Sequence, residues 1–208
     1  DWNEDRYLSA LDFHPGDRAL VHHIILYLDT QNVADALDEK DADPGYECFG
    51  GPGTDFNITS ISSLFSAGRS MAGGWAPGQR ASHLPEGVGI EIPKGAKLIM
   101  LIHYFPLART GPDQTSVGFY FTKEKPQRRL YHIPVLNTSF KIPPGAESHD
   151  VVAQIPAILD AKVIAIYPHM HLLGRQIKVE YEEGLLNPKK TPLIYIDNWD
   201  FNWQGYYT

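Results

Sequence analysis

The sequence predicts an all-β fold built from two antiparallel β-sandwiches in tandem. Apolar runs of strand length, such as residues 18–28 and 96–105, recur along the chain and are bounded by turn residues. The 18 glycines and 16 prolines, with 12% aromatic residues, are typical of a turn-rich β protein. No segment carries a sustained helical period, so no long helix is predicted.

The first half of the chain alternates apolar runs with turns. Its predicted strands cover residues 6–13, 18–28, 87–92, 96–105 and 116–122. Residues 31–41 have roughly helical spacing of apolar residues and predict a short helical or irregular link. Residues 43–85 are interrupted by Gly-rich turns and are expected to be mostly loop, held down by apolar anchors such as Trp75.

A charged stretch at residues 123–129 interrupts the pattern and marks a predicted boundary between a domain at 1–125 and a domain at 126–208. The predicted strands of the second domain cover residues 130–135, 149–158, 161–167, 176–181 and 192–196. The aromatic end at 198–208 does not complete a further strand. We therefore expect the second sandwich to be incomplete and the chain to be a piece of a longer protein.

Composition excludes several classes of protein. The chain of 208 residues has 43% hydrophobic residues, enough for a packed core, and a net charge of −7. No basic stripe is present to follow a phosphate backbone, which argues against a nucleic-acid partner. No apolar run reaches the length of a membrane span. The single cysteine, Cys48, leaves no pair for an internal disulfide.

Histidine placement is the strongest functional signal. The chain has nine histidines, and five lie within or beside apolar runs: His22, His23, His103, His169 and His171. An unpartnered polar group buried in such a run costs on the order of 2–7 kcal/mol. One such residue is usually a core histidine with a hydrogen-bond partner, but five residues, including two local pairs, predict metal binding.

Local spacing predicts how these histidines are grouped. Residues i and i+2 of a strand share a face, so His169 and His171 can offer two imidazoles to one ion while Met170 points away. His22 and His23 are adjacent and can share an ion only at a β-bulge or a strongly twisted strand end. With His103 as a third ligand, the first half would hold a three-nitrogen group and the second half a two-nitrogen group.

The donor set favours copper. Imidazole suits zinc, copper, iron and nickel, and the lack of adjacent carboxylates argues against magnesium, calcium and a facial-triad iron site. A zinc hydrolase is the alternative, and it would need a general base, for which Asp150 and Asp160 are the candidates.

Four segments together resemble one known family: residues 21–27, 74–78 with 84–89, 101–104, and 168–175. In this order they are similar to the copper type II, ascorbate-dependent monooxygenases, the family of peptidylglycine α-hydroxylating monooxygenase and dopamine β-monooxygenase. The resemblance implies two jelly-roll-like β-sandwich domains with one copper ion in each.

The resemblance also implies the role of each group. The copper held by His22, His23 and His103 would store an electron. The copper held by His169, His171 and a methionine would bind O2 and hydroxylate a C–H bond of a peptide or small-molecule substrate. Ascorbate would be the reductant, one oxygen atom would leave as water, and the protein would be secreted, periplasmic or extracellular.

The sequence departs from the family pattern at the second group. The methionines are Met71, Met100 and Met170, and none follows residue 175, where the family's ligand is expected. The third ligand of this group is therefore unassigned, and the lone Cys48 makes the chain more similar to bacterial-type members than to animal ones. The alternative is a non-catalytic copper-binding or structural β-sandwich protein within a larger secreted assembly.

Overall fold

A computed structural model describes residues 2–48, 51–53, 61–105, 111–137, 139–184 and 186–208. Within these ranges strands predominate and most pair antiparallel, which confirms the all-β prediction. The strands are β1 (Arg6–His14), β2 (Val21–Asp29), β3 (Met71–Trp75), β4 (Ser82–His83), β5 (Val88–Ile92), β6 (Lys97–Tyr104), β7 (Ser116–Phe121), β8 (Arg128–Arg129), β9 (Ile177–Glu183) and β10 (Lys189–Ile196). The helices are α1 (Val33–Asp38) and α2 (Ile61–Ser70).

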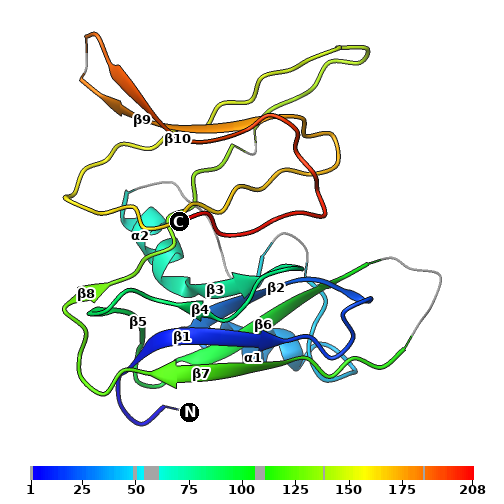
Figure 1. Ribbon diagram of the computed structural model, residues 1–208. Helices are drawn as coiled ribbons and strands as arrows, with labels where there is room; N and C mark the ends of the chain where they lie inside the picture. Colours follow the sequence, from blue (N-terminus) through cyan, green and yellow to red (C-terminus); the bar gives the residue numbers. More distant parts are fainter. Residues whose placement is uncertain (1, 49–50, 54–60, 106–110, 138, 185) are drawn as a thin grey trace.

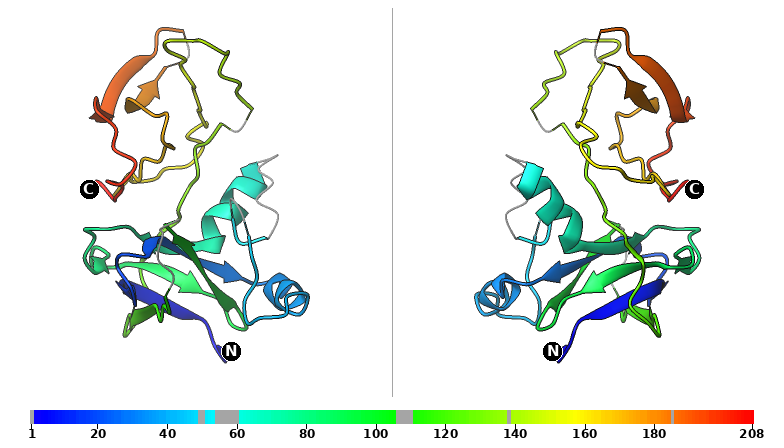
Figure 2. Two further views of the ribbon diagram at one scale, coloured as in Figure 1. Left: turned by 90° about the vertical axis from the view of Figure 1, so that its right-hand side faces the viewer. Right: turned by 90° about the vertical axis from the view of Figure 1, so that its left-hand side faces the viewer.

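The chain forms two parts, which Figure 1 shows one above the other. The first part holds β1 to β8 and both helices, and the second part holds β9 and β10 with long irregular segments. Figure 2 shows a single extended segment leaving the first part for the second, while the C-terminal segment returns toward the first part.

The first part is a β-sandwich. Its five-stranded sheet has the order β4-β1-β5-β8, with β7 also paired to β1, and its three-stranded sheet has the order β3-β2-β6. The pairs are antiparallel except for the short parallel pairing of β5 with β8. Both sheets contribute side chains to one buried cluster: Leu8, Leu11, Phe13, Val21, Ile24, Leu26, Leu28, Ala72, Trp75, Ile90, Ile92 and Ala96.

This core fixes the position of β2. Leu26 is 1% exposed and Ile24 is fully buried, and burying each such side chain contributes about 1.5–3 kcal/mol. A shift of β2 by one residue would turn this apolar set to the other face, so the register of β2 against β6 is strongly specified.

The second part lacks a comparable core among its described residues. β9 and β10 form a two-stranded antiparallel sheet, and many apolar side chains around it are exposed. Those at least 39% exposed include Val135, Leu136, Phe140, Ile142, Val151, Val152, Ile155, Ile158, Leu159 and Val163. This exposure distinguishes the second part from the first, whose apolar side chains form a buried cluster.

Three strand predictions in the second half were wrong. Residues 130–135, 149–158 and 161–167 form no strand, although their apolar sequences favour one. A strand requires a run of paired neighbours, and of these residues only Ile166 forms a β-bridge, an isolated one with Tyr207. The predictions at 176–181 and 192–196 were confirmed as β9 and β10.

The backbone keeps contact with the first part just beyond the predicted domain boundary. β8 pairs with β5, Leu130 donates its N–H to the Gly89 carbonyl, and His132 donates to the Gly68 carbonyl. The division at 125 and 126 remains a prediction, and the hydrogen bonds of the first sandwich extend to about residue 132.

Helix α2 was not predicted, since residues 43–85 were expected to be mostly loop. It buries Leu64 and Ala67, three residues apart, against the side of β2 and β3. Its serines and Gly68 lower the helix propensity, and packing of the apolar face overrides that local preference. The shorter α1 lies inside the link expected at 31–41. Neither helix, over the part of the chain described, is long and apolar enough to cross a membrane.

Candidate metal centre

A β-bulge at the start of β2 brings three histidines together. His23 lies directly opposite His103 of β6, and the next aligned pair is Val21 with Tyr104, so His22 is the extra residue. The expected bulge is therefore present. It turns two adjacent side chains toward one place, which a regular strand would not do.

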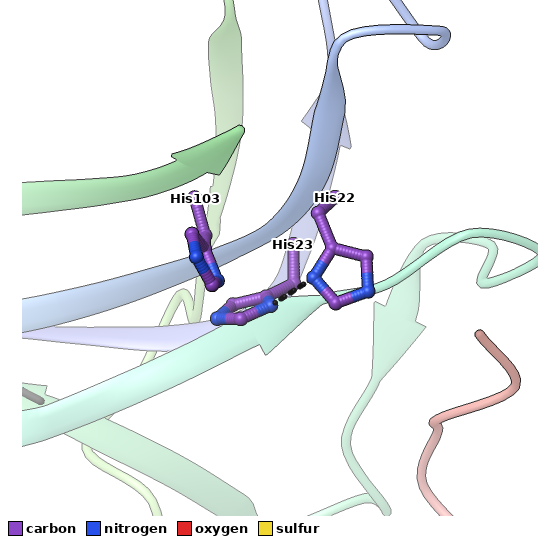
Figure 3. Close-up of side chains that lie close together, drawn as sticks. All are labelled: His22, His23 and His103. Atoms are coloured by element: carbon purple, nitrogen blue, oxygen red, sulfur yellow. Dashed lines mark hydrogen bonds between the residues drawn. The ribbon is translucent and has the colours of Figure 1, made fainter. Parts of the chain in front are cut away.

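The three imidazoles converge, as Figure 3 shows. One ring nitrogen from each of His22, His23 and His103 lies within 4.8 Å of the others, and the Nδ1 atoms of His22 and His23 are 3.0 Å apart. Imidazole nitrogens bind zinc-sized ions at about 2.0–2.1 Å, and two such ligands on one ion are separated by roughly 3 Å. The three donor atoms are therefore close enough to share one metal ion after small rotations of the rings.

The group is closed on one side and open on the other. His22 is 4% exposed, His23 is half-buried and His103 is exposed. The His22 ring stacks on Phe201 at 4.7 Å between centroids and meets the edge of Phe105 at 4.5 Å. The solvent-accessible side of the group is therefore the side of His103.

Burial and neighbouring histidines lower the pKa values of His22 and His23, which favours their neutral form. Burial, followed by the neighbouring His103, His22, His169 and His171, lowers the pKa of His23 from 6.5 to about 3. Burial and then His103 and His169 also lower the pKa of His22. A metal ion needs the unprotonated imidazole, so the ligand form prevails at neutral pH without displacement of a proton.

His169 and His171 form the second group. Their ring centroids are 5.1 Å apart and their planes are nearly perpendicular, so the two imidazoles lie together as expected. They sit in a loop after the Ile166 bridge instead of on the predicted strand. The His169 Nδ1 lies 2.6 Å from the Oε1 atom of Gln204, and burial lowers the His169 pKa.

Among the described residues, His169 and His171 have no third His, Cys, Asp or Glu donor beside them. The one group of three or more His, Cys, Asp or Glu donors found in the described ranges is that of His22, His23 and His103. Met170 packs over Gly174, where an added Cβ would lie 2.9 Å from the Met170 Cβ and 3.0 Å from its Cε. Asp150 and Asp160, the candidate bases of a zinc hydrolase, are exposed and outside the three-histidine group.

One segment near the C-terminus touches both groups, and sequence reasoning missed it. Phe201 stacks on His22 and also lies 6.3 Å from the His171 ring centroid, edge to face. In Figure 3 the C-terminal segment passes beside His22. The aromatic run at 198–208 was the available signal, but nothing in its spacing indicates which histidine each ring meets.

The structure is thus an all-β protein in which three imidazoles lie close together at one strand end. The chain is also similar in sequence to known proteins. The chain is 27% identical over 209 residues to "DBH-like monooxygenase protein 1" of Gallus gallus, an alignment covering 90% of this chain and 31% of that protein. It is 27% identical over 213 residues to the Homo sapiens protein of the same name, covering 92% and 32% of the two chains.

The Mus musculus protein of that name is 26% identical over 217 residues, again covering 92% of this chain and 32% of its own length. The chain thus spans about a third of the length of the curated relatives it matches. No family model and no solved structure matches. The similarities relate the chain to DBH-like monooxygenases.

Proposed function

We propose that this chain is the metal-binding portion of a copper-dependent monooxygenase that hydroxylates an activated C–H bond with O2 and a reductant such as ascorbate. The observation that carries the proposal is the convergence of His22, His23 and His103 at the bulge of β2. The similarity to DBH-like monooxygenases supports the same chemistry.

Three imidazoles can hold copper or zinc, and the similarity to DBH-like monooxygenases favours copper. The group of His22, His23 and His103 is all imidazole, which is compatible with both Cu(I) and Cu(II), and no described carboxylate joins it. A hydrolytic zinc site would need a carboxylate or another base beside the bound water. The exposed positions of Asp150 and Asp160 do not provide one.

The two histidine groups would have different roles, one in electron storage and the other in O2 activation. Copper would supply one-electron transfer and O2 activation, while the chain's own residues set where each ion sits. His22, His23 and His103 would hold an ion in a pocket partly closed by aromatic rings, suited to storing an electron. His169 and His171 would hold the second ion with a coordination position left for a small molecule.

The overall reaction would insert one oxygen atom into the C–H bond and release the other as water. This balance requires two electrons and two protons in addition to O2, and ascorbate would supply the electrons. The substrate would be a peptide or another small molecule. The third ligand of the second ion would come from outside the pair His169 and His171.

A second candidate function is copper binding without oxygenation, within a larger secreted assembly. The specific observation in its favour is the contrast between a group of three converging imidazoles and a group of two. Electron storage or copper transport needs the first group alone, whereas C–H hydroxylation needs both.

Domain division and location are part of the same proposal. We propose copper monooxygenase-like domains at residues 1–125 and 126–208, the second of them partial, in a secreted or periplasmic protein. These statements rest on the resemblance of the histidine segments to the copper monooxygenases.

Oxygen uptake tests the proposed function. The full-length protein carrying this chain would be loaded with copper and supplied with ascorbate and a panel of amidated, amine and peptide substrates. Ascorbate-dependent O2 consumption that yields hydroxylated product is expected, and His171→Ala should abolish it. His149→Ala, a change at an exposed histidine, should leave it intact.

The alternatives give different results in the same experiment. Bound copper without product formation would favour the non-catalytic candidate. Activity that depends on zinc and consumes no O2 would contradict both copper proposals.

A further inference from the structure

Gln204 is a buried polar side chain with both ends of its amide engaged. It is 7% exposed, and its Nε2 donates to the Phe201 carbonyl at 2.7 Å. Its Oε1 lies 2.6 Å from the Nδ1 of His169, a residue 35 positions away in the sequence. A buried amide end without a hydrogen-bond partner is unfavourable, so the two hydrogen bonds together hold the amide in one orientation.

This arrangement fixes the proton of His169. A backbone carbonyl can only accept, so the amide NH2 must face Phe201 and the amide oxygen must face His169. That oxygen can also only accept, so the His169 Nδ1 must carry the proton. The lone pair of the neutral imidazole is then on Nε2, the atom turned away from Gln204 and free to bind an ion.

The same short segment also positions a histidine of the first group. Phe201, whose carbonyl holds the Gln204 amide, stacks its ring on His22 at 4.7 Å with an interplanar angle of 26°. Its ring also meets His171 edge to face at 6.3 Å. One turn of chain therefore contacts His22, His169 and His171 through two side chains.

We infer that Phe201 and Gln204 are positioning residues that link the two histidine groups: Gln204 sets the tautomer of His169, and Phe201 sets the ring plane of His22. The inference rests on the proposed function for its consequence, which is metal binding, but its core is a statement about protons and rings in the metal-free protein. Partners that orient a ligand histidine typically contribute about 10–100-fold to metal affinity.

Nitrogen NMR of the metal-free protein tests the tautomer. With 15N-labelled histidine, the unmodified protein should show His169 protonated on Nδ1. Gln204→Leu should release this preference, and Gln204→Glu, which keeps an acceptor facing His169, should retain it. Gln154→Leu is the matched control at an exposed glutamine and should change nothing.

The pair of Gln204 variants separates positioning from general damage to the fold. A proton on Nε2 of His169 in the unmodified protein would overturn the inference, as would an unchanged tautomer in a folded Gln204→Leu variant. This measurement involves no copper, so it stands or falls independently of the proposed function.

Copper titration tests the link between the groups. Gln204→Leu should weaken binding at the His169 and His171 group by about 10–100-fold. Phe201→Leu should change the Cu(II) electron paramagnetic resonance spectrum of the first group, although residue 201 supplies no ligand, while Phe140→Leu, at a half-exposed ring, should not. If Gln204→Leu binds copper with unchanged affinity and Phe201→Leu gives an unchanged spectrum, the linking role is overturned. If neither the unmodified protein nor any variant binds copper, the proposed function is contradicted.

Discussion

The two parts of the molecule each carry a histidine group, and they hold it in different ways. In the first part His23 and His103 face each other across a strand pair inside a sandwich with a continuous buried core. In the second part His169 and His171 sit in a loop, and the nearest ordering contact is the side chain of Gln204. The positions of the imidazoles are set by strand register in the first part and by individual hydrogen bonds in the second.

The two parts also differ in how much apolar surface they bury. Apolar side chains of the first part are largely buried, whereas those of the second part are widely exposed among the described residues. The first group should therefore tolerate local changes around it as long as the core persists. The second group should be sensitive to a few nearby side chains and insensitive to most of the apolar residues of its own half.

The largest expected difference between the two parts is in stability. Leu26→Ala removes a side chain that is 1% exposed and should lower the free energy of unfolding by about 2–5 kcal/mol. Leu159→Ala makes the same chemical change at a side chain that is 62% exposed and should cost no more than about 0.5 kcal/mol. Urea denaturation measures both, and equal losses would contradict the contrast between a packed and an open half.

The second expected difference between the two parts is the affinity of their histidine groups for copper. Three converging imidazoles bind an ion more tightly than two, so His103→Ala should weaken the tighter of the two copper sites by more than the roughly 10–100-fold typical of an orienting partner. His171→Ala should affect only the weaker site. Competition with a copper chelator measures both constants, and loss of the tighter site in His171→Ala would reverse the assignment.

Acidification should destabilise the first part through its histidines. The pKa of His23 is about 3 in the folded chain and ordinarily 6.5, so the unfolded chain binds more protons between these values. Stability from this residue is therefore full above about pH 6.5 and is lost as the pH falls toward 3.

The His23→Asn variant removes this contribution and should lose less stability between neutral and mildly acidic pH than the unmodified protein. Urea denaturation at the two pH values gives the slopes, and His83→Asn, at an exposed histidine, is the control. Parallel pH profiles for all three proteins would contradict the assignment of the shift to His23.

The smallest expected effect concerns two turns that have the same backbone geometry. Gly95 and Gly145 both follow a proline-containing turn and have φ of 76° and 77°. A left-handed backbone costs a residue with a Cβ about 1–2 kcal/mol, so Gly95→Ala should lower the unfolding free energy of the first part by that amount. Gly145→Ala should lower the unfolding free energy of the first part only if the second part unfolds together with it. Calorimetry of both variants would show whether the halves unfold as one unit, and a loss caused by Gly145→Ala alone would contradict the account.

The sequence was informative where local rules decide the structure. The adjacency of His22 and His23 within an apolar run required a bulge, and the bulge is present. Runs with partners in the first half became strands. Such inferences succeed because the apolar pattern that marks a strand is a property of neighbouring residues, even when the strand it pairs with lies far along the chain.

The remaining features depend on distant partners. Residues 149–158 have the composition of a strand but no neighbour to pair with among the described residues. Helix α2 forms because Leu64 and Ala67 find a surface on the first sandwich, which outweighs its weak propensity. The contact of His169 with Gln204 joins two irregular segments 35 residues apart, and no periodicity encodes it.

X-ray absorption of a single-copper form would show whether His22, His23 and His103 hold one copper ion together. In the His171→Ala protein the second group is disabled, so one equivalent of copper should occupy the group of His22, His23 and His103. The spectrum should show three imidazole nitrogens at about 2.0 Å from the copper, and two when His103→Ala is added. Absence of bound copper, or an imidazole count that His103→Ala leaves unchanged, would contradict the account.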